Sequence, residues 1–437
     1  MSLLPEDPCS PLPLDDEQVT IPDMFVSFLS QEPQINPNYE KVKGESEAWI
    51  AQLCHYDEKT YKKHVKADFP YFVSIWARDA GLEELRTICD WMNWVFDFDD
   101  MFDEGSFRDN REEATRRVQE LKDVMQTENQ DATETAEDPL LEVFRTVWYR
   151  VAKRSSKGAR RRFIQSMTDY ADGVLGQVEV VCSAEQPDEE HFLALRRKSI
   201  GAGPCFALIE YFYGLDLPDE IFEHPSVQRL DELAREMIVI QNDALSFPKE
   251  LAEGMDQNLV ALYGHSGIPP QEAYDKIDVL LKARYREWYL AQADLPQWGE
   301  TIDRQVQHYI RAMQDVITAN MYWSFNTTRY FGKRTEYVRR TRVINIPSDQ
   351  LVKNGLALPQ SRSPSPPNDG DRRRNQDGDR SLSEANTIVN ESLASEGGSN
   401  FYGQKILDAV STVQVKLGDK KLASLRRRLT SWVRGSR

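Results

Sequence analysis

Apolar residues recur every three or four positions along much of this chain, which is the spacing of one buried face of an α-helix. The clearest stripe runs through Leu82, Leu85, Ile88, Cys89, Met92, Val95 and Phe96. A second stripe contains Leu230, Leu233, Met237, Ile238 and Ile240. Because this spacing dominates over the alternation typical of β-strands, the sequence predicts an all-α protein.

Carboxylates continue the first stripe at the point where it ends. Asp99, Asp100 and Asp103 follow Phe96 on the same helix face, whereas Asp97 is expected to face solvent or another polar group. Carboxylates on a core-facing stripe repel one another and resist desolvation unless a cation or a water-filled cavity lies beside them. Oxygen ligands of this kind suit Mg²⁺. The pattern favours a magnesium site over its alternative, a solvated helix end.

The second stripe also ends in oxygen-bearing side chains. Asn242, Ser246 and Glu250 are four residues apart, so they share one helix face and together could hold one Mg²⁺. Lys249 adds a cation at the same place. Pro248 lacks a backbone donor and crowds the preceding turn, so we expect it to kink or end the helix and disturb the alignment of Glu250.

These two segments resemble the metal-binding motifs of a known family, the class I terpene synthases. Residues 99–103 match its D-D-x-x-D motif, and residues 242–250 match its N-D-x-x-S-x-x-K-E motif. The shorter matches are the Arg-Arg-Lys-Ser-Ile-Gly segment at 196–201, the pair Arg329-Tyr330 and the pair Asn36-Pro37. The resemblance covers roughly residues 21–331 and is closest to the microbial, fungal-type sesquiterpene cyclases.

The resemblance implies a fold and a reaction. The expected fold is a single-domain class I helical bundle with an active-site cavity. The expected reaction is the Mg²⁺-dependent ionisation of an isoprenoid diphosphate, cyclisation of the resulting carbocation, and release of diphosphate. Farnesyl diphosphate, with fifteen carbons, is the favoured substrate, and C10 and C20 substrates stay open.

The resemblance also assigns roles to individual residues. Three Mg²⁺ ions are expected with bound diphosphate, two held by Asp99 and Asp103 and the third by Asn242, Ser246 and Glu250. Asp100 is not expected to bind metal directly. The residues implied to contact the diphosphate are Arg196 or Arg197, Lys249, Arg329 and Tyr330. Because Arg196 and Arg197 are adjacent and point in different directions, only one is expected to face the site, and Arg197 is slightly preferred.

A carbocation needs a wall that does not react with it, and aromatic faces provide one. The candidates are Phe72, Trp76, Phe96, Tyr211, Phe212 and Trp323. Phe96 and Trp323 are favoured as substrate contacts because they lie close to Asp99 and Arg329 in the sequence. The alternative for each candidate is an ordinary place in the core.

Two other functions compete with cyclisation. A chain-elongating prenyltransferase also uses Mg²⁺ and isoprenoid diphosphates, but it carries a second aspartate-rich motif, whereas this chain has residues 242–250 in that place. A non-enzymatic helical interaction protein would account for the fold but would leave both sets of oxygen ligands unexplained.

Composition divides the 437 residues into four parts. Residues 1–20 are predicted to be a disordered tail, 21–340 the cyclase domain, and 341–400 a low-complexity linker rich in Ser, Pro, Asp and Gly. Residues 401–437 regain apolar spacing beside many Lys and Arg, as in a basic amphipathic helix. Such a helix could touch a membrane surface or a partner, or dock weakly on the domain.

Charge and cysteine content indicate which partners and which cellular compartment to expect. The net charge of −17 argues against nucleic-acid binding, which depends on clustered Lys and Arg. The five cysteines form no C-x-x-C pair, which fits a cytoplasmic protein without disulfides. No apolar run has the length of a transmembrane segment.

Overall fold

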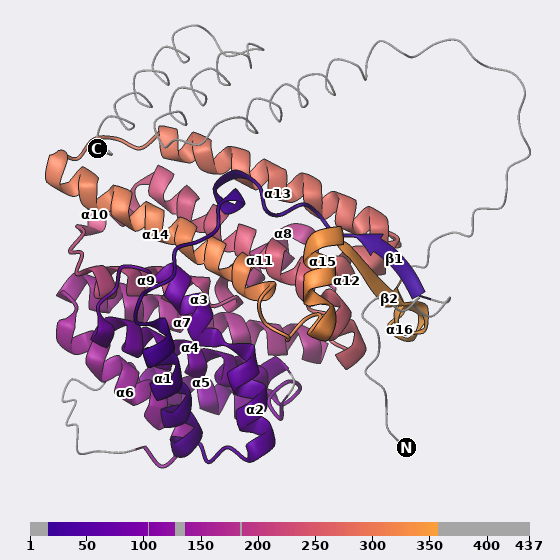
Figure 1. Ribbon diagram of the computed structural model, residues 1–437, viewed down its shortest axis with the longest axis horizontal. Helices are drawn as coiled ribbons and strands as arrows, with labels where there is room; N and C mark the ends of the chain where they lie inside the picture. Colours follow the sequence, from indigo (N-terminus) through magenta and orange to yellow (C-terminus); the bar gives the residue numbers. More distant parts are fainter. Residues whose placement is uncertain (1–15, 104, 127–135, 184–185, 357–437) are drawn as a thin grey trace, which may run out of the picture. The chain divides into compact units, whose positions relative to one another are not determined.

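The computed structural model describes residues 16–103, 105–126, 136–183 and 186–356, all within one compact unit, Met1–Gln360 (Figure 1). These residues are mainly helical. The longer helices are α1 (Tyr39–Leu53), α2 (Glu58–Ala67), α3 (Phe69–Trp76), α4 (Leu82–Asp103), α5 (Arg111–Gln126), α6 (Pro139–Arg154), α7 (Lys157–Ser183), α8 (Glu189–Ser199), α9 (Ala202–Tyr213), α11 (Pro225–Glu253), α13 (Pro270–Ala293) and α14 (Glu300–Ser324). The shorter elements are β1 (Asp16–Thr20), η1 (Ser27–Ser30), α10 (Asp219–Glu223), α12 (Leu259–His265), η2 (Gly332–Arg334), α15 (Thr335–Thr341), β2 (Val343–Pro347) and α16 (Ser348–Lys353).

Helix α4, predicted from the first apolar stripe, lies inside the bundle and packs against α1, α3 and α6. It is buried on nearly all sides from Leu85 to Val95, whereas Leu82, in its first turn, is 38% exposed. The buried Asp90 carboxylate accepts hydrogen bonds from Ser46 Oγ, Arg86 Nε and Arg150 Nη1. These partners offset the cost of burying the charge, so α4 is held by polar as well as apolar contacts.

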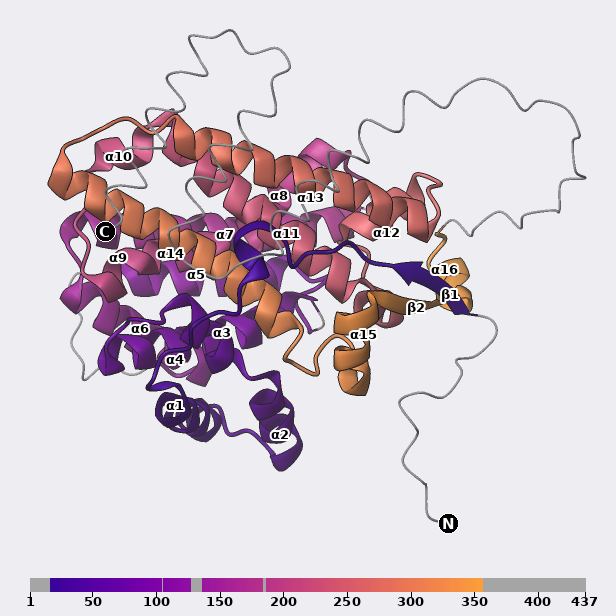
Figure 2. The ribbon, with the colours of Figure 1, turned by 45° about the horizontal axis from the view of Figure 1, so that its top comes forward.

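Helix α11 lies between α13 and α14 and carries the second stripe (Figure 2). It begins at Pro225, after the His224 side chain has capped the Ser226 N–H, and ends at Gly254, whose φ of 70° is left-handed. The helix runs through Pro248 without ending. We expected Pro248 to kink or end the helix; it does not end it, and Glu250 lies on the same helix as Asn242.

Helices α8 and α9 are separated by a break at Ile200 and Gly201. Gly201 has a φ of 73°, a left-handed conformation that glycine adopts without the steric cost of a Cβ. Helix α7 approaches this break closely, because a Cβ on Gly173 would lie 2.6 Å from the backbone nitrogen of Ser199. The residues of the 196–201 segment are therefore fixed against α7.

Two strands at the edge of the bundle correct the predicted boundaries (Figure 1). β1 pairs antiparallel with β2, with Val19 opposite Ile344, and both side chains are buried. Residues 16–20 therefore belong to the folded unit and not to a disordered tail, and residues 341–356 belong to it and not to a linker. β1 contains a single apolar residue, Val19, and β2 is only five residues long, so neither segment gave enough alternation to predict a strand.

The remaining predictions about the chain ends fall on residues 1–15 and 357–437, outside the described residues. They include the linker beyond residue 356 and the basic amphipathic segment 401–437. Within the described residues, none of the helices combines the length and the apolar character that crossing a bilayer requires.

The pairing of β1 with β2 predicts a difference between two neighbouring substitutions. Val19→Asp places a carboxylate against the core and should lower the free energy of unfolding by about 2 kcal/mol or more. Gln18→Asp adds the same side chain at an exposed position and should change it by less than about 0.5 kcal/mol. Urea unfolding of both variants measures the difference, and equal effects would contradict the role of β1 in the fold.

Candidate active site

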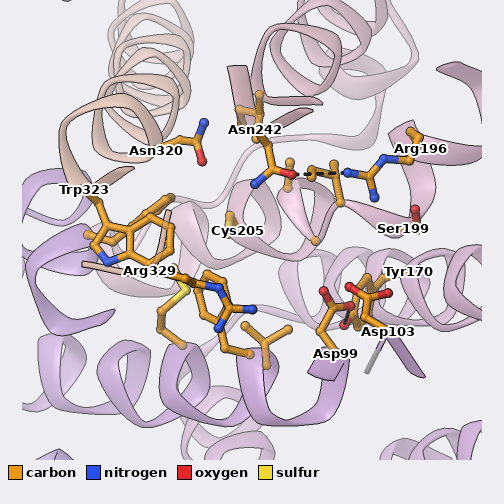
Figure 3. Close-up of a pocket in the computed structure, with 18 of the residues that line it drawn as sticks. Asp99, Asp103, Tyr170, Arg196, Ser199, Cys205, Asn242, Asn320, Trp323 and Arg329 are labelled. Atoms are coloured by element: carbon orange, nitrogen blue, oxygen red, sulfur yellow. Dashed lines mark hydrogen bonds between the residues drawn. The ribbon is translucent and has the colours of Figure 1, made fainter. Parts of the chain in front are cut away.

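A cavity lies between α4, α7, the α8–α9 break, α11 and α14, with a wall completed by the segment after α14. The predicted site residues that line it are Phe96, Asp99, Asp103, Arg196, Asn242, Lys249, Glu250, Trp323, Arg329 and Tyr330. Figure 3 shows Asp99 and Asp103 on one side of the cavity and Asn242 and Arg196 on the other. The two motifs, far apart in the sequence, therefore face the same space.

The last turn of α4 places two carboxylates at the cavity. Asp99 Oδ1 accepts a hydrogen bond of 2.9 Å from Tyr170 Oη on α7. Burial raises the pKa of Asp99 to about 6, and burial followed by the nearby Asp99 charge raises the pKa of Asp103 to about 8. Both groups would be stabilised in their charged form by a bound cation, because a cation offsets desolvation and mutual repulsion.

The other two aspartates of this segment point elsewhere. Asp100 accepts a hydrogen bond of 2.7 Å from Arg329 Nη2, so it positions the Arg329 guanidinium at the cavity. Asp97 accepts from the Tyr56 hydroxyl and lies 3.7 Å from His64 Nδ1. Neither is among the residues that line the cavity.

The second motif reaches the cavity through its first and last members. Asn242 Nδ2 donates a hydrogen bond of 3.2 Å to Tyr330 Oη, and Glu250 Oε2 accepts one of 2.8 Å from Asn258. Burial, followed by the nearby Asp243 charge, raises the pKa of Glu250 to about 7. Ser246 is buried on the turn between Asn242 and Glu250 and does not line the cavity.

The three predicted cations beside this motif have different surroundings. Lys249 lines the cavity and forms an ion pair of 2.6 Å with Glu253. Arg329 lies with its guanidinium carbon 5.7 Å from the centre of the Phe96 ring, in reach of a cation–π contact. Arg196 enters from α8 on the opposite wall. The cavity thus has cationic groups from α8, from α11 and from the segment after α14.

Arg196, and not Arg197, lies at the cavity. Arg196 Nη2 donates a hydrogen bond of 2.8 Å to Asp243 and one of 3.3 Å to Asn242. Arg197 points away and forms ion pairs with Glu232 and Glu236. The preference for Arg197 as the diphosphate contact and catalytic residue is therefore corrected: two acidic partners on α11 draw its side chain off the site.

Only some of the aromatic candidates line the cavity. Phe72, Phe96 and Trp323 line the cavity, whereas Trp76, Tyr211 and Phe212 do not and pack in the core. Phe96 is stacked on Phe69 with ring centroids 4.0 Å apart, and Trp323 donates its indole N–H to the carbonyl of Ala67 at 2.7 Å. Because both rings are fixed by these contacts, they form a rigid apolar wall.

Among the cavity or near-cavity residues that were not predicted are Tyr170, Ser199, Asn258 and Asn320. Tyr170 and Ser199 come from α7 and α8, and Asn320 Nδ2 donates to Gln241 Oε1 at 3.0 Å in an otherwise apolar part of the cavity (Figure 3). Only Ser199 had a sequence signal, since it lies in the 196–201 segment. The others become visible only when distant helices are brought together.

The cavity has donor sets for a cation and for an anion. The oxygen atoms of Asp99, Asp103, Asn242 and Glu250 suit a hard divalent metal. Within the described ranges, no three His, Cys, Asp or Glu residues cluster as a metal site. Arg196 Nε is buried and has no hydrogen-bond partner among the described residues. Phosphate oxygens would complete the metal coordination and accept from such donors.

Comparison with known proteins agrees with this arrangement. Residues 90–287 match the family described as terpene synthase family 2, C-terminal metal binding. The chain is 43% identical to silphinene synthase of Penicillium patulum over 76% of this chain and 91% of the relative. It is 32% identical to sesquiterpene synthase 3 of Postia placenta over 79% of this chain and 93% of the relative. The crystal structure of α-eudesmol synthase superposes with a TM-score of 0.62 at 20% identity, covering 68% of this chain and 98% of that chain.

The helical bundle and its likeness to the structure of α-eudesmol synthase show the class I terpenoid synthase fold, which confirms the predicted fold class. The chain belongs to the terpene synthase family. It is therefore an enzyme of the terpene cyclase class, and metal binding is a property of that family.

The raised pKa values predict how stability depends on pH without metal. A carboxyl whose pKa is higher in the folded than in the unfolded protein stabilises the fold at low pH, and that contribution is lost as pH rises through the folded pKa. In EDTA, the free energy of unfolding should therefore fall between about pH 4, where these carboxyls titrate in the unfolded protein, and about pH 8, the highest of the folded pKa values of Asp99, Glu250 and Asp103.

Asp103→Asn should flatten this fall, because each pKa unit corresponds to about 1.4 kcal/mol and Asn does not titrate. Urea unfolding across the pH range measures the slope. The exposed Glu112→Gln is the matched control and should keep the wild-type slope. A slope that is the same for Asp103→Asn would contradict the buried, protonated state of this carboxyl.

Proposed function

We propose that this protein ionises and cyclises farnesyl diphosphate to a sesquiterpene, with Mg²⁺ as its metal. The observation that carries the proposal is the cavity itself, in which two sets of oxygen ligands and three cations face an aromatic wall. The fifteen-carbon substrate is supported by the relative named as a sesquiterpene synthase, which aligns over 93% of its length.

The polar end of the cavity fits the diphosphate group. Arg196, Lys249 and Arg329 supply positive charge, and the Tyr330 hydroxyl can donate a hydrogen bond. Preplaced cations in a cavity with little water stabilise the negative charge that develops on a leaving group. These residues therefore favour departure of the diphosphate.

The metal ligands lie at the same end. Asp99 and Asp103 would hold metal from α4, and Asn242 and Glu250 from α11, with Ser246 on the turn between them. Up to three Mg²⁺ ions bound there would neutralise the diphosphate and assist its departure. Because Mg²⁺ held by these side chains would keep coordination positions open for phosphate oxygens, binding of metal and of diphosphate should depend on each other.

The apolar end suits a carbocation. Phe72, Phe96 and Trp323 present aromatic faces to it and offer no nucleophile. Their fixed contacts limit the conformations of the isoprenoid chain, which favours ring closure over random capture by water. The Asn320 amide is a polar group on this wall, and Gln241 fixes its orientation.

The proposal predicts products that can be measured directly. The protein is incubated with Mg²⁺ and, separately, with C10, C15 and C20 isoprenoid diphosphates, and volatile products are identified by gas chromatography and mass spectrometry. A cyclic C15 product that disappears with EDTA is expected. Linear, longer diphosphates formed after adding isopentenyl diphosphate would favour the prenyltransferase alternative.

Asp99→Asn tests the metal set in the same assay. It should lower turnover by about a hundredfold or more, because it removes a charged ligand from the site of leaving-group departure. Asp97→Asn is the matched control on the same helix, and it should retain turnover because Asp97 does not line the cavity. Full activity of Asp99→Asn would refute the proposed metal site.

The adjacent arginines provide a second matched pair. Arg196→Gln should lower turnover by about a hundredfold or more, because a buried cation at the cavity is lost. Arg197→Gln should retain turnover within a few-fold but lower the thermal midpoint, since Glu236 loses one of its two arginine partners. Steady-state kinetics and thermal unfolding of both variants separate these effects, and the reverse pattern would assign the site to Arg197.

A further inference from the structure

Helix α11 carries a proline inside the second metal motif, and its continuation past this proline to Glu253 needs an explanation. Pro248 has no N–H, so the carbonyl of Ala244, four residues earlier, loses its helical hydrogen bond. Ala244 is fully buried, where an unsatisfied carbonyl is costly. Tyr274 Oη, from α13, donates a hydrogen bond of 3.0 Å to this carbonyl. The hydroxyl thus takes the place of the missing backbone donor.

Asn258, the residue before α12, holds the same turn from another side. Its Nδ2 donates to the backbone carbonyl of Asp243 at 2.9 Å and to Glu250 Oε2 at 2.8 Å, and lies 3.4 Å from Ser246 Oγ. Its Oδ1 accepts from the Val260 N–H at 2.8 Å. Because one end of the amide must accept and the other must donate, its orientation is fixed by its partners.

The start of α12 also reaches the diphosphate-facing arginine. The Asp243 carboxylate accepts from Arg196 Nη2 through Oδ1 and from the Leu259 N–H through Oδ2, both at 2.8 Å. Asp243 and Asn258 are both fully buried. The segment 258–260 therefore holds Glu250 through Asn258 and Arg196 through Asp243.

We propose that Asn258 and Tyr274 are positioning residues. Their hydrogen bonds stabilise the turn of α11 in which Pro248 cannot donate a backbone hydrogen bond, and they keep Glu250 aligned with Asn242 for metal binding. The metal part of this inference rests on the proposed function. The backbone part does not, because the hydrogen bond of Tyr274 to Ala244 involves no ligand. Figure 2 shows α11, α12 and α13, the elements that this arrangement joins.

The backbone part is tested by a double-mutant cycle in metal-free protein. Tyr274→Phe alone should raise the unfolding equilibrium constant by about tenfold to a hundredfold, because the buried Ala244 carbonyl loses its donor. Pro248→Ala restores a backbone N–H, so adding Tyr274→Phe to it should raise the constant by less than about threefold. If Tyr274→Phe raises the unfolding equilibrium constant equally in the wild-type protein and in Pro248→Ala, Tyr274 does not replace the backbone donor.

The metal part is tested with Asn258→Ser, because serine can still cap α12 but is too short to reach Glu250 as the amide does. The readout is the Mg²⁺ concentration that gives half of the thermal stabilisation in the presence of inorganic diphosphate. This concentration should rise by about tenfold or more. Asn354→Ala is the matched control and should leave it unchanged, since Asn354 Nδ2 donates to the Leu251 carbonyl of α11 but to none of the metal motif's side chains.

The outcomes separate the two proposals. An unchanged Mg²⁺ requirement in Asn258→Ser, with a normal wild-type response, would overturn the positioning role of Asn258. A wild-type protein that Mg²⁺ and diphosphate do not stabilise would refute the proposed function, and the cycle of Pro248 and Tyr274 would still decide the backbone part. If Asn258→Ser does not fold, Asn258→Asp keeps the cap, and its added charge beside Glu250 should also change the Mg²⁺ requirement.

Discussion

The partial burial and mutual repulsion of carboxylates gathered at one cavity are the constraint on which the rest of this structure depends. Asp99, Asp103 and Glu250 are partly shielded from water, and this burial raises their pKa values although Arg196 lies nearby. Such groups persist only because surrounding contacts over-determine their positions. Helix α4 is fixed by the ion pairs of Asp90, and α11 by contacts with α12 and α13. The stability of the bundle thus holds repelling carboxylates together, and a bound metal ion would relieve that repulsion.

The same constraint explains why the site was visible in the sequence. Charged residues seldom continue a core-facing stripe, so Asp99 and Asp103 stood out, and the four-residue spacing from Asn242 to Glu250 was equally regular. The all-α fold followed from the dominance of helical spacing. Both kinds of prediction rest on periodicity along one helix, which a single sequence displays directly.

Features that depend on two distant segments were not predictable in this way. The choice between Arg196 and Arg197 is made by Asp243, Glu232 and Glu236 on another helix. The passage of α11 through Pro248 depends on a hydroxyl from α13, and the strand at residues 16–20 exists only because residues 343–347 pair with it. Local propensity was overridden by tertiary contacts in each case.

The pairing of β1 with β2 has a consequence for how the chain completes its fold. The two strands are separated by nearly the whole length of the described domain, so their contact is among the least local in the protein. Closing so long a loop costs entropy that is recovered only when the intervening helices have packed. During synthesis, Val19 leaves the ribosome early, and its partner Ile344 is made only near the end of the domain. The first strand can therefore pair only after translation has passed residues 343–347, although it is the first described element to be made.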